Sequence, residues 1–232
     1  MINNIQIEIC IGNIDDALTA SKYPIDRIEL NSALELGGLT ASLETLKYLK
    51  QNIKPKICCM VRPRGCNFVY TDLEFKTMLK DAKLLLENGA DGIVFGFTKD
   101  NKVDYERTKE MVELVHSYGK EAVFHKAYDE VDDLDLATKT LVELKVNRVL
   151  TSGKAVYPDI LQGCQKIAKL HEQYPEIEFL PGGGVRVNNI ADVIKTANSG
   201  QVHMTSKRTN EGGYVELEES QLIQLLDQIK TI

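Results

Sequence analysis

Apolar and polar residues alternate along several short stretches of the chain, separated by stretches with helical spacing. In the first of these, Ile5, Ile7 and Ile9 alternate with Gln6, Glu8 and Cys10, a period of two that is typical of a β-strand. Alternation of this kind, or a short apolar run, predicts eight strands along the chain. They are residues 4–10, 25–30, 56–61, 92–95, 121–125, 148–150, 176–180 and 202–204.

A helix is predicted after every strand. Helix starts are indicated by side chains that can cap the first turn, and glycine marks several helix ends. The predicted helices are residues 15–22, a helix capped at Thr40 or Ser42, one from Thr71 or Asp72 to Gly89, one from Asp104 to Tyr118, and 133–144, 158–171, 188–197 and 217–229. Eight strand-then-helix units in 232 residues predict an α/β fold, a compact single (β/α)8 TIM-type barrel formed by one domain of residues 1–232. A doubly wound open sheet is the alternative.

Period two also predicts which side chains face the barrel axis. The apolar set of each strand packs under the helices, so the alternate set points inward. This inward set is Gln6, Glu8 and Cys10; Arg27, Glu29 and Asn31; Cys58, Met60 and Arg62; and His125 and His203. Buried charges are normally paired or used. The charged ring is therefore either a salt-bridge network that satisfies itself or a polar pocket at the strand ends that carry chemistry in this fold.

Three consecutive glycines, Gly182, Gly183 and Gly184, lie between the strand at 176–180 and the helix at 188–197. Bare backbone N–H groups next to a helix start form a seat for an anion such as phosphate, although a flexible turn is the plainer interpretation. Ser206, with Thr205, follows the last strand and shares the usual phosphate position of the fold. The remaining predicted ligand-binding residues are Arg27, Arg62, Arg64, Asp129, Thr151, Ser152 and His203. Together they predict a small anionic, phosphate-bearing ligand.

Glu8, Glu29 and His125 are the candidates for general acid and base, because their burial beside arginines would set their pKa values. Such a pocket suits isomerisation or aldol-type cleavage of a small phosphorylated molecule, and no lysine is placed for a Schiff base. A divalent metal held by Glu8, Glu29, His125 and His203 is another interpretation, which the neighbouring arginines oppose.

The composition narrows the partners and the compartment. A net charge of −6 and a pI near 5.4 argue against nucleic acid or an anionic membrane as a partner. No apolar run approaches the roughly 20 residues needed to span a bilayer, and the amino terminus lacks signal-peptide features, so a cytoplasmic protein is expected. The five cysteines contain no CxxC pair and are expected to be free thiols.

Several motifs resemble the CutC family, which is named for copper homeostasis. They are Ile7-Glu-Ile-Cys10, Asp26-Arg-Ile-Glu-Leu30, Gly37-Gly-Leu-Thr-Ala-Ser42, Val61-Arg-Pro-Arg-Gly65 with Phe68-x-Tyr-x-Asp72, Asp91-Gly-Ile-Val-Phe-Gly96, Phe124-His125 with Ala127-x-Asp129, Arg148-Val-Leu-Thr-Ser-Gly153 and Pro181-Gly-Gly-Gly-Val185. The resemblance implies a cytosolic TIM-type barrel, a homo-oligomer (a dimer or tetramer) and a connection with copper.

Two positions depart from the family pattern. Members discussed as copper(I) binders carry one cysteine in the first strand, matched here by Cys10, and another where this chain has Asn31. Copper(I) prefers soft sulfur ligands, so Asn31 weakens copper(I) as a cofactor bound at Cys10. Convergence of Cys10, Cys58 and Met60 is an alternative sulfur site. Lys126 replaces the usual arginine and keeps its positive charge without its bidentate geometry.

Overall fold

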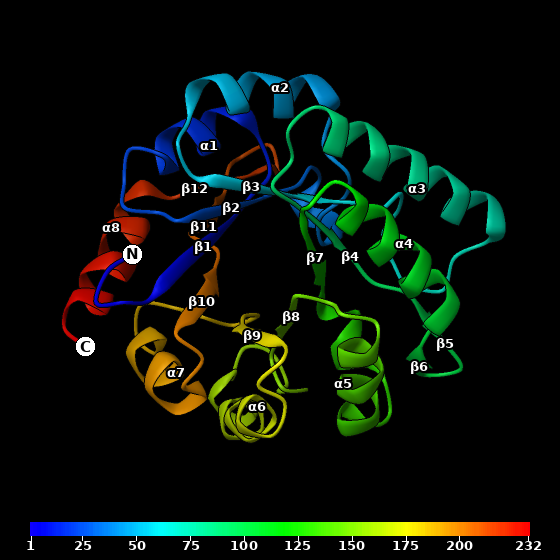
Figure 1. The fold of residues 1–232 in the computed structure, drawn as a ribbon. Coiled ribbons are helices and arrows are strands. Elements are labelled where there is room, and N and C mark those ends of the chain that lie inside the picture. The colour runs from blue at the N-terminus through cyan, green and yellow to red at the C-terminus, as the bar shows by residue number, and fades with distance from the viewer.

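Eight parallel strands form one curved sheet that makes a nearly closed barrel with helices on its outside (Figure 1). The computed structural model describes residues 1–232. The barrel strands are β1 (Gln6–Ile11), β2 (Arg27–Leu30), β3 (Lys56–Met60), β4 (Gly92–Phe95), β7 (Glu121–Phe124), β8 (Arg148–Thr151), β9 (Glu178–Pro181) and β10 (Gln201–Met204). Their order is β10-β1-β2-β3-β4-β7-β8-β9, and β9 lies beside β10 at the seam. The predicted TIM-type barrel is confirmed.

The helices alternate with the strands along the chain. They are α1 (Ile14–Ala20), α2 (Leu43–Asn52), α3 (Asp72–Glu87), α4 (Tyr105–Ser117), α5 (Leu134–Glu143), α6 (Leu161–Gln173), α7 (Ile190–Ala197) and α8 (Glu219–Lys230). Ser42, Thr71, Asp104 and Asp133 accept hydrogen bonds from the first turns of α2 to α5, and Thr71 forms a capping box with Glu74. None of these helices has the length and apolar character needed to cross a bilayer.

The predicted alternation of strand side chains is confirmed by the packing. Ile7, Ile9, Ile57 and Cys59 belong to a cluster of 56 buried residues that fills the space between sheet and helices. A separate small cluster, Cys58, Met60, Val94 and Val123, fills part of the barrel axis. The remainder of the axis therefore holds the polar inward set, and this is why the interior of the barrel carries charge.

Two hairpins and two short 3₁₀ turns were absent from the predicted elements. The chain after β4 forms β5 (Thr98–Lys99) and β6 (Lys102–Val103), and the chain after β10 forms β11 (Lys207–Thr209) and β12 (Val215–Leu217). The 3₁₀ turns are η1 (Leu34–Leu36) and η2 (Lys126–Glu130). Strands of two or three residues are too short to show a period of two. The signal that could have found the first hairpin is Asp100-Asn101, whose φ angles of 49° and 54° fit a tight primed turn.

Candidate functional site

A cavity of about 230 Å³ lies at the carboxyl-terminal ends of the strands, and we call it the mouth cavity. Strand ends contribute Cys10, Glu29, Met60, His125 and His203 to its lining, and loops contribute Arg62, Phe68, Lys126, Tyr157, Gly183, Gly184, Arg186, Thr205 and Lys207. Four of these side chains are cationic and one is a carboxylate. The carboxyl-terminal position is where active sites lie in this fold.

Below the mouth cavity, polar and charged side chains form a connected set that we call the floor network. It comprises the buried residues Glu8, Arg27, Gln201 and Arg148, with the more exposed Glu121 and Glu178 at its edge. Arg27 Nε donates to Glu8 Oε2, and Arg27 Nη2 donates to Gln201 Oε1 at 3.0 Å. Gln201 Nε2 and Arg148 both donate to Glu178 Oε2, and Arg148 Nη1 donates to Glu121 Oε2 at 2.8 Å. Glu8 and Arg27 were predicted as catalytic and ligand-binding residues, but neither lines the mouth cavity, and their charged groups are engaged with each other.

His203 connects the floor network to the cavity. Its Nδ1 lies 2.7 Å from Glu8 Oε1, and its Nε2 lies 4.0 Å from Glu29 Oε2. Burial acts to lower the pKa of His203, but the carboxylates of Glu29 and Glu8 outweigh burial and raise this pKa above 6.5. Burial acts to raise the pKa of Glu8, while Arg27 and His203 reverse this and hold the pKa at about 2. Glu29 and Glu8 therefore both favour the protonated form of His203, and Glu8 also orients its ring through Nδ1.

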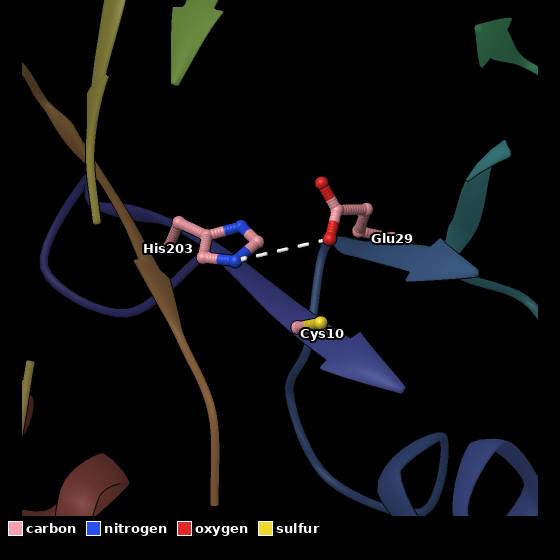
Figure 2. A group of neighbouring side chains, drawn as sticks. All are labelled: Cys10, Glu29 and His203. Atoms are coloured by element: carbon pink, nitrogen blue, oxygen red, sulfur yellow. Dashed lines mark ion pairs between the residues drawn. The ribbon is translucent and has the colours of Figure 1, made fainter. Parts of the chain in front are cut away.

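Glu29 faces the cavity with one oxygen unused. Asn31 Nδ2 donates to Glu29 Oε2 at 2.9 Å, whereas Glu29 Oε1 is buried without a hydrogen-bond partner. Cys10 Sγ lies beside this carboxylate, and Figure 2 shows Cys10, Glu29 and His203 converging from β1, β2 and β10. Burial and the charge of Glu29 raise the pKa of the Cys10 thiol well above 9.0. A carboxylate with one free oxygen, whose other oxygen lies 4.0 Å from an imidazole nitrogen, is an arrangement capable of proton transfer.

His125 also presents a free polar atom. Its Nδ1 accepts from Ala127 N at 3.1 Å, and its Nε2 is buried without a partner. Burial, followed by the charge of Arg62, lowers the pKa of His125 to about 3. The ring is therefore neutral at pH 7 and carries its proton on Nε2, because Nδ1 is an acceptor. This makes His125 a hydrogen-bond donor toward a ligand, and it weakens the general-base role predicted for it.

The two predicted arginine clamps have different surroundings. Arg62 lines the cavity, yet its Nη1 donates to the carbonyls of Leu36, Gly37 and Gly38, and its Nη2 donates to that of Cys66. Its Nε is buried and unpartnered. Arg64 is paired with Glu74, with Nε to Oε1 at 2.6 Å, and does not line the cavity. Arg62 thus keeps one donor for a ligand, and Arg64 holds its loop to α3.

Gly183 and Gly184 of the glycine loop line the cavity. Gly183 and Gly184 have φ values of 90° and 113°, which favour glycine, and a Cβ at Gly183 would collide with Lys126 Nζ. No hydrogen bond of the protein uses the backbone N–H of Gly183, Gly184 or Val185. Three free N–H groups beside an ammonium group have the character of an anion seat.

Other predicted ligand-binding residues lie outside the cavity lining. Thr151 and Ser152 donate their hydroxyls to Asp129, which also accepts from the backbone of Ser152 and Lys154. Ser206 Oγ donates to the carbonyl of Glu218. Gly182 allows close packing against Leu150 and His203. These residues organise the loops around the mouth cavity.

The sequence interpretation omitted three polar side chains of the lining, Tyr157, Arg186 and Lys207, and the apolar Phe68, Leu150 and Met204. Arg186 Nη2 donates to Tyr157 Oη at 2.8 Å, and its guanidinium lies 5.6 Å from the centre of that ring. Arg186 directly follows the glycine motif, and Lys207 follows the last barrel strand by three residues. Listing every cation in the loops after the predicted strands would have found both.

Comparison with known proteins identifies relatives over most of the chain. A model described as the CutC family matches residues 5–208. A Treponema denticola protein named as a family protein CutC is 44% identical over 212 residues, covering 90% of this chain and 85% of that protein. The human "copper homeostasis protein cutC homolog" is 34% identical, covering 91% and 77%.

Solved structures show the same architecture. The crystal structure of a putative copper homeostasis protein CutC from Streptococcus agalactiae has a TM-score of 0.79 and 31% identity, covering 86% of this chain and 97% of that one. A deoxyribose phosphate aldolase from Aeropyrum pernix has a TM-score of 0.67 at 16% identity, covering 98% and 90%. The second likeness is one of fold alone.

Proposed function

Because this chain belongs to the CutC family, we propose that it acts in copper homeostasis, as its relatives are named, through a mouth cavity that binds a small anionic, phosphate-bearing ligand. The names of the human and Streptococcus agalactiae proteins support the first part. The ligand class is proposed from the chemistry of the cavity.

One observation carries the ligand proposal: free donors and cations gather on one wall of the cavity. The unpaired N–H groups of Gly183, Gly184 and Val185 lie where Lys126 Nζ meets the loop, and Arg186 lines the same cavity. Backbone N–H groups that have no acceptor in the protein and that line a cavity favour an acceptor-rich ligand. Phosphate supplies several acceptor oxygens and the matching charge.

The test is a calorimetric titration of the purified protein with inorganic phosphate and with a small sugar phosphate. Arg186→Gln should weaken phosphate binding about tenfold, since a hydrogen bond to a charged group contributes about 1.5 kcal/mol or more. Arg208→Gln is the matched control, because Arg208 is exposed on β11 and pairs with Glu216. Equal affinities for both variants and the parent protein would refute the ligand proposal. Mass spectrometry of metabolites retained from a cell extract would then identify the natural ligand.

A second candidate function is acid/base catalysis on a phosphorylated metabolite, as a lyase or isomerase. The observation that favours it is the free Glu29 Oε1, in a carboxylate whose other oxygen is 4.0 Å from His203 Nε2. Glu29 would act as the base and protonated His203 as the acid, while neutral His125 donates a hydrogen bond to substrate. Glu29→Gln should abolish turnover of a retained metabolite and leave its binding intact; unchanged turnover would exclude this role.

Copper(I) fits the residues at Cys10 poorly. Asn31 Nδ2 lies 3.4 Å from Cys10 Sγ, so an amide stands where a second thiol would complete a soft ligand pair. Cys58 packs in the barrel axis and does not line the cavity. Asn31→Cys should therefore raise copper(I) affinity in a chelator competition, whereas tight copper(I) binding by the parent protein that is lost in Cys10→Ser would overturn this assessment.

The cytoplasmic location and the dimer or tetramer implied by the resemblance stay predictions. Fractionation of cells and light scattering of the purified protein test them.

A further inference from the structure

Three side chains of different chemistry converge at the base of the mouth cavity. Cys10, Glu29 and His203 each offer one ligand atom, and these atoms all lie within 4.8 Å of one another (Figure 2). They come from the adjacent strands β1, β2 and β10, whose ladders pair Cys10 with Glu29 and Glu8 with His203. A site supported by three neighbouring strands is held more rigidly than one on loops.

Neighbouring groups orient all three side chains. Glu8 Oε1 binds His203 Nδ1 at 2.7 Å, which leaves the lone pair of Nε2 for the cavity when the imidazole is neutral. Asn31 Nδ2 donates to Glu29 Oε2 at 2.9 Å and contacts Cys10 Sγ at 3.4 Å. A carboxylate behind a histidine ligand and a hydrogen bond to a carboxylate ligand are regular features of metal sites.

Independently of this convergence, Glu29 Oε1 is buried and unpartnered, and the residue is 3% exposed. A carboxylate oxygen left without a donor in the interior is costly. The protein supplies no donor for this oxygen. The oxygen that lies 4.0 Å from His203 Nε2 is Oε2, which accepts from Asn31, so an ion held beside His203 would bind Oε2 and would reach Oε1 through bidentate coordination.

We propose that Cys10, Glu29 and His203 form a binding site for a divalent ion of the zinc type, with its fourth position open to the mouth cavity. One thiolate, one imidazole and one carboxylate are ligands that Zn²⁺ accepts, and three protein ligands with an open position are typical of its catalytic sites. The negative charges of the thiolate and the carboxylate balance the two positive charges of the ion, so the occupied site has no net charge. Bound there, the ion would supply Lewis acidity toward an oxygen of a ligand in the cavity.

The site uses different residues from the proposed anion seat. Lys126 follows β7 and the glycine loop follows β9, whereas the three ligands come from β10, β1 and β2. The two sets adjoin at the seam, where β9 lies beside β10 and Gly182 packs against His203. Arg27, which reaches the cluster through Glu8, is already paired with that carboxylate. The metal proposal therefore goes beyond the proposed function, and it can be refuted while the anion proposal stands.

Cobalt(II) is the probe for the test, because it replaces zinc and reports on thiolate ligation through a sulfur-to-metal charge-transfer band. Reduced, chelator-treated protein is titrated with Co²⁺ and then with Zn²⁺. We expect a charge-transfer band that saturates at one equivalent and disappears when Zn²⁺ is added. Cys10→Ser should remove the band, and Glu29→Gln should weaken Zn²⁺ binding at least about tenfold.

Cys66→Ser is the matched control, since Cys66 is an exposed thiol that does not line the cavity, and it should keep the band. Thermal unfolding of each variant shows that it folds, and Glu29→Gln gives a second readout if Cys10→Ser does not. A parent protein without a charge-transfer band, or a band that survives Cys10→Ser and vanishes in Cys66→Ser, overturns the proposal. Phosphate titration of the metal-free protein shows separately whether the anion seat exists.

Discussion

The floor network and the mouth cavity contain the same kinds of side chain and differ in how completely those side chains are paired. In the floor network the guanidinium groups of Arg27 and Arg148 are bonded to carboxylates or to Gln201. In the mouth cavity Glu29 Oε1, His125 Nε2 and Arg62 Nε are buried without partners. Buried charge alone therefore does not mark a functional site in this barrel, whereas unsatisfied buried groups beside a cavity do.

This contrast predicts that substitutions in the floor network lower the free energy of unfolding, whereas substitutions in the mouth cavity lower the affinity for ligands. The largest effect is expected for Arg27→Met. Removing the arginine leaves Glu8 buried without its main counter-ion, which should cost about 3–5 kcal/mol in the free energy of unfolding. Urea unfolding at pH 7 measures this loss.

The control for this prediction is Lys47→Met, which breaks the surface pair of Lys47 with Glu44. We expect a change within about 0.5 kcal/mol. If Arg27→Met is no more harmful than Lys47→Met, the floor network is not a structural element.

The next effect concerns acid. Burial and Arg62 depress the pKa of His125 from its ordinary value of 6.5 to about 3. Below pH 6.5 the unfolded chain binds a proton at this residue that the folded protein does not bind. The free energy of unfolding therefore decreases as the pH is lowered, by roughly 2 kcal/mol from pH 6.5 to 4.5. His125→Gln should lack this part of the fall. Urea unfolding of both proteins over this range of pH isolates the contribution of His125, because Glu8 and His203 are present in both. The same dependence of unfolding free energy on pH in the two proteins would contradict a neutral, buried His125.

The pKa shifts of Glu8 and His203 affect stability in other ranges of pH. The pKa of about 2 for Glu8 contributes stability that is present above pH 4.5 and lost as the pH falls toward 2. The raised pKa of His203 contributes stability that is present below pH 6.5 and lost as the pH rises through the folded pKa.

A smaller effect is expected from Lys126→Gln. This lysine meets the glycine loop, so its loss should weaken phosphate binding by about tenfold, or 1.4 kcal/mol, without changing the unfolding midpoint. Lys154→Gln is the comparison, because Lys154 Nζ donates to the carbonyl of Val131 and does not line the cavity. Similar losses of phosphate affinity in the two variants would show that general charge, and not the seat, binds the anion.

For Glu29→Gln, among the cavity variants, only a small change in stability is expected. Because Glu29 Oε1 has no partner, the isosteric amide should alter the free energy of unfolding by less than about 1 kcal/mol. Chemical denaturation measures it. A loss as large as that of Arg27→Met would place Glu29 in the structural network and remove it from the functional site.

The fold could be predicted because every barrel strand carries a period of two or an apolar run, and because caps such as Thr71, Asp104 and Asp133 mark helix starts. The same period placed Glu8, Glu29, His125 and His203 on the inner side of the barrel. It could not show which of them are paired, since that depends on side-chain geometry between strands far apart in sequence. Glu8 and His203, for example, are 195 residues apart.

The loops were less predictable for a related reason. Asp129, Thr151 and Ser152 carry suitable ligand-binding groups, but contacts across the β7 and β8 loops direct these groups toward one another. Arg64 is likewise held by Glu74, ten residues further along the chain. Residue type indicates what a loop side chain can bind, and only the structure shows whether another part of the chain already binds it.

The most direct measurement of the contrast is the response of individual backbone amides to inorganic phosphate, followed by nuclear magnetic resonance. The N–H groups of Gly183 and Gly184 have no acceptor in the protein, whereas the N–H of Lys154, on a neighbouring loop, donates to Asp129. We expect saturable shifts of the Gly183 and Gly184 resonances and none of Lys154. Unchanged glycine resonances, or equal shifts at all three amides, would contradict an anion site in the mouth cavity.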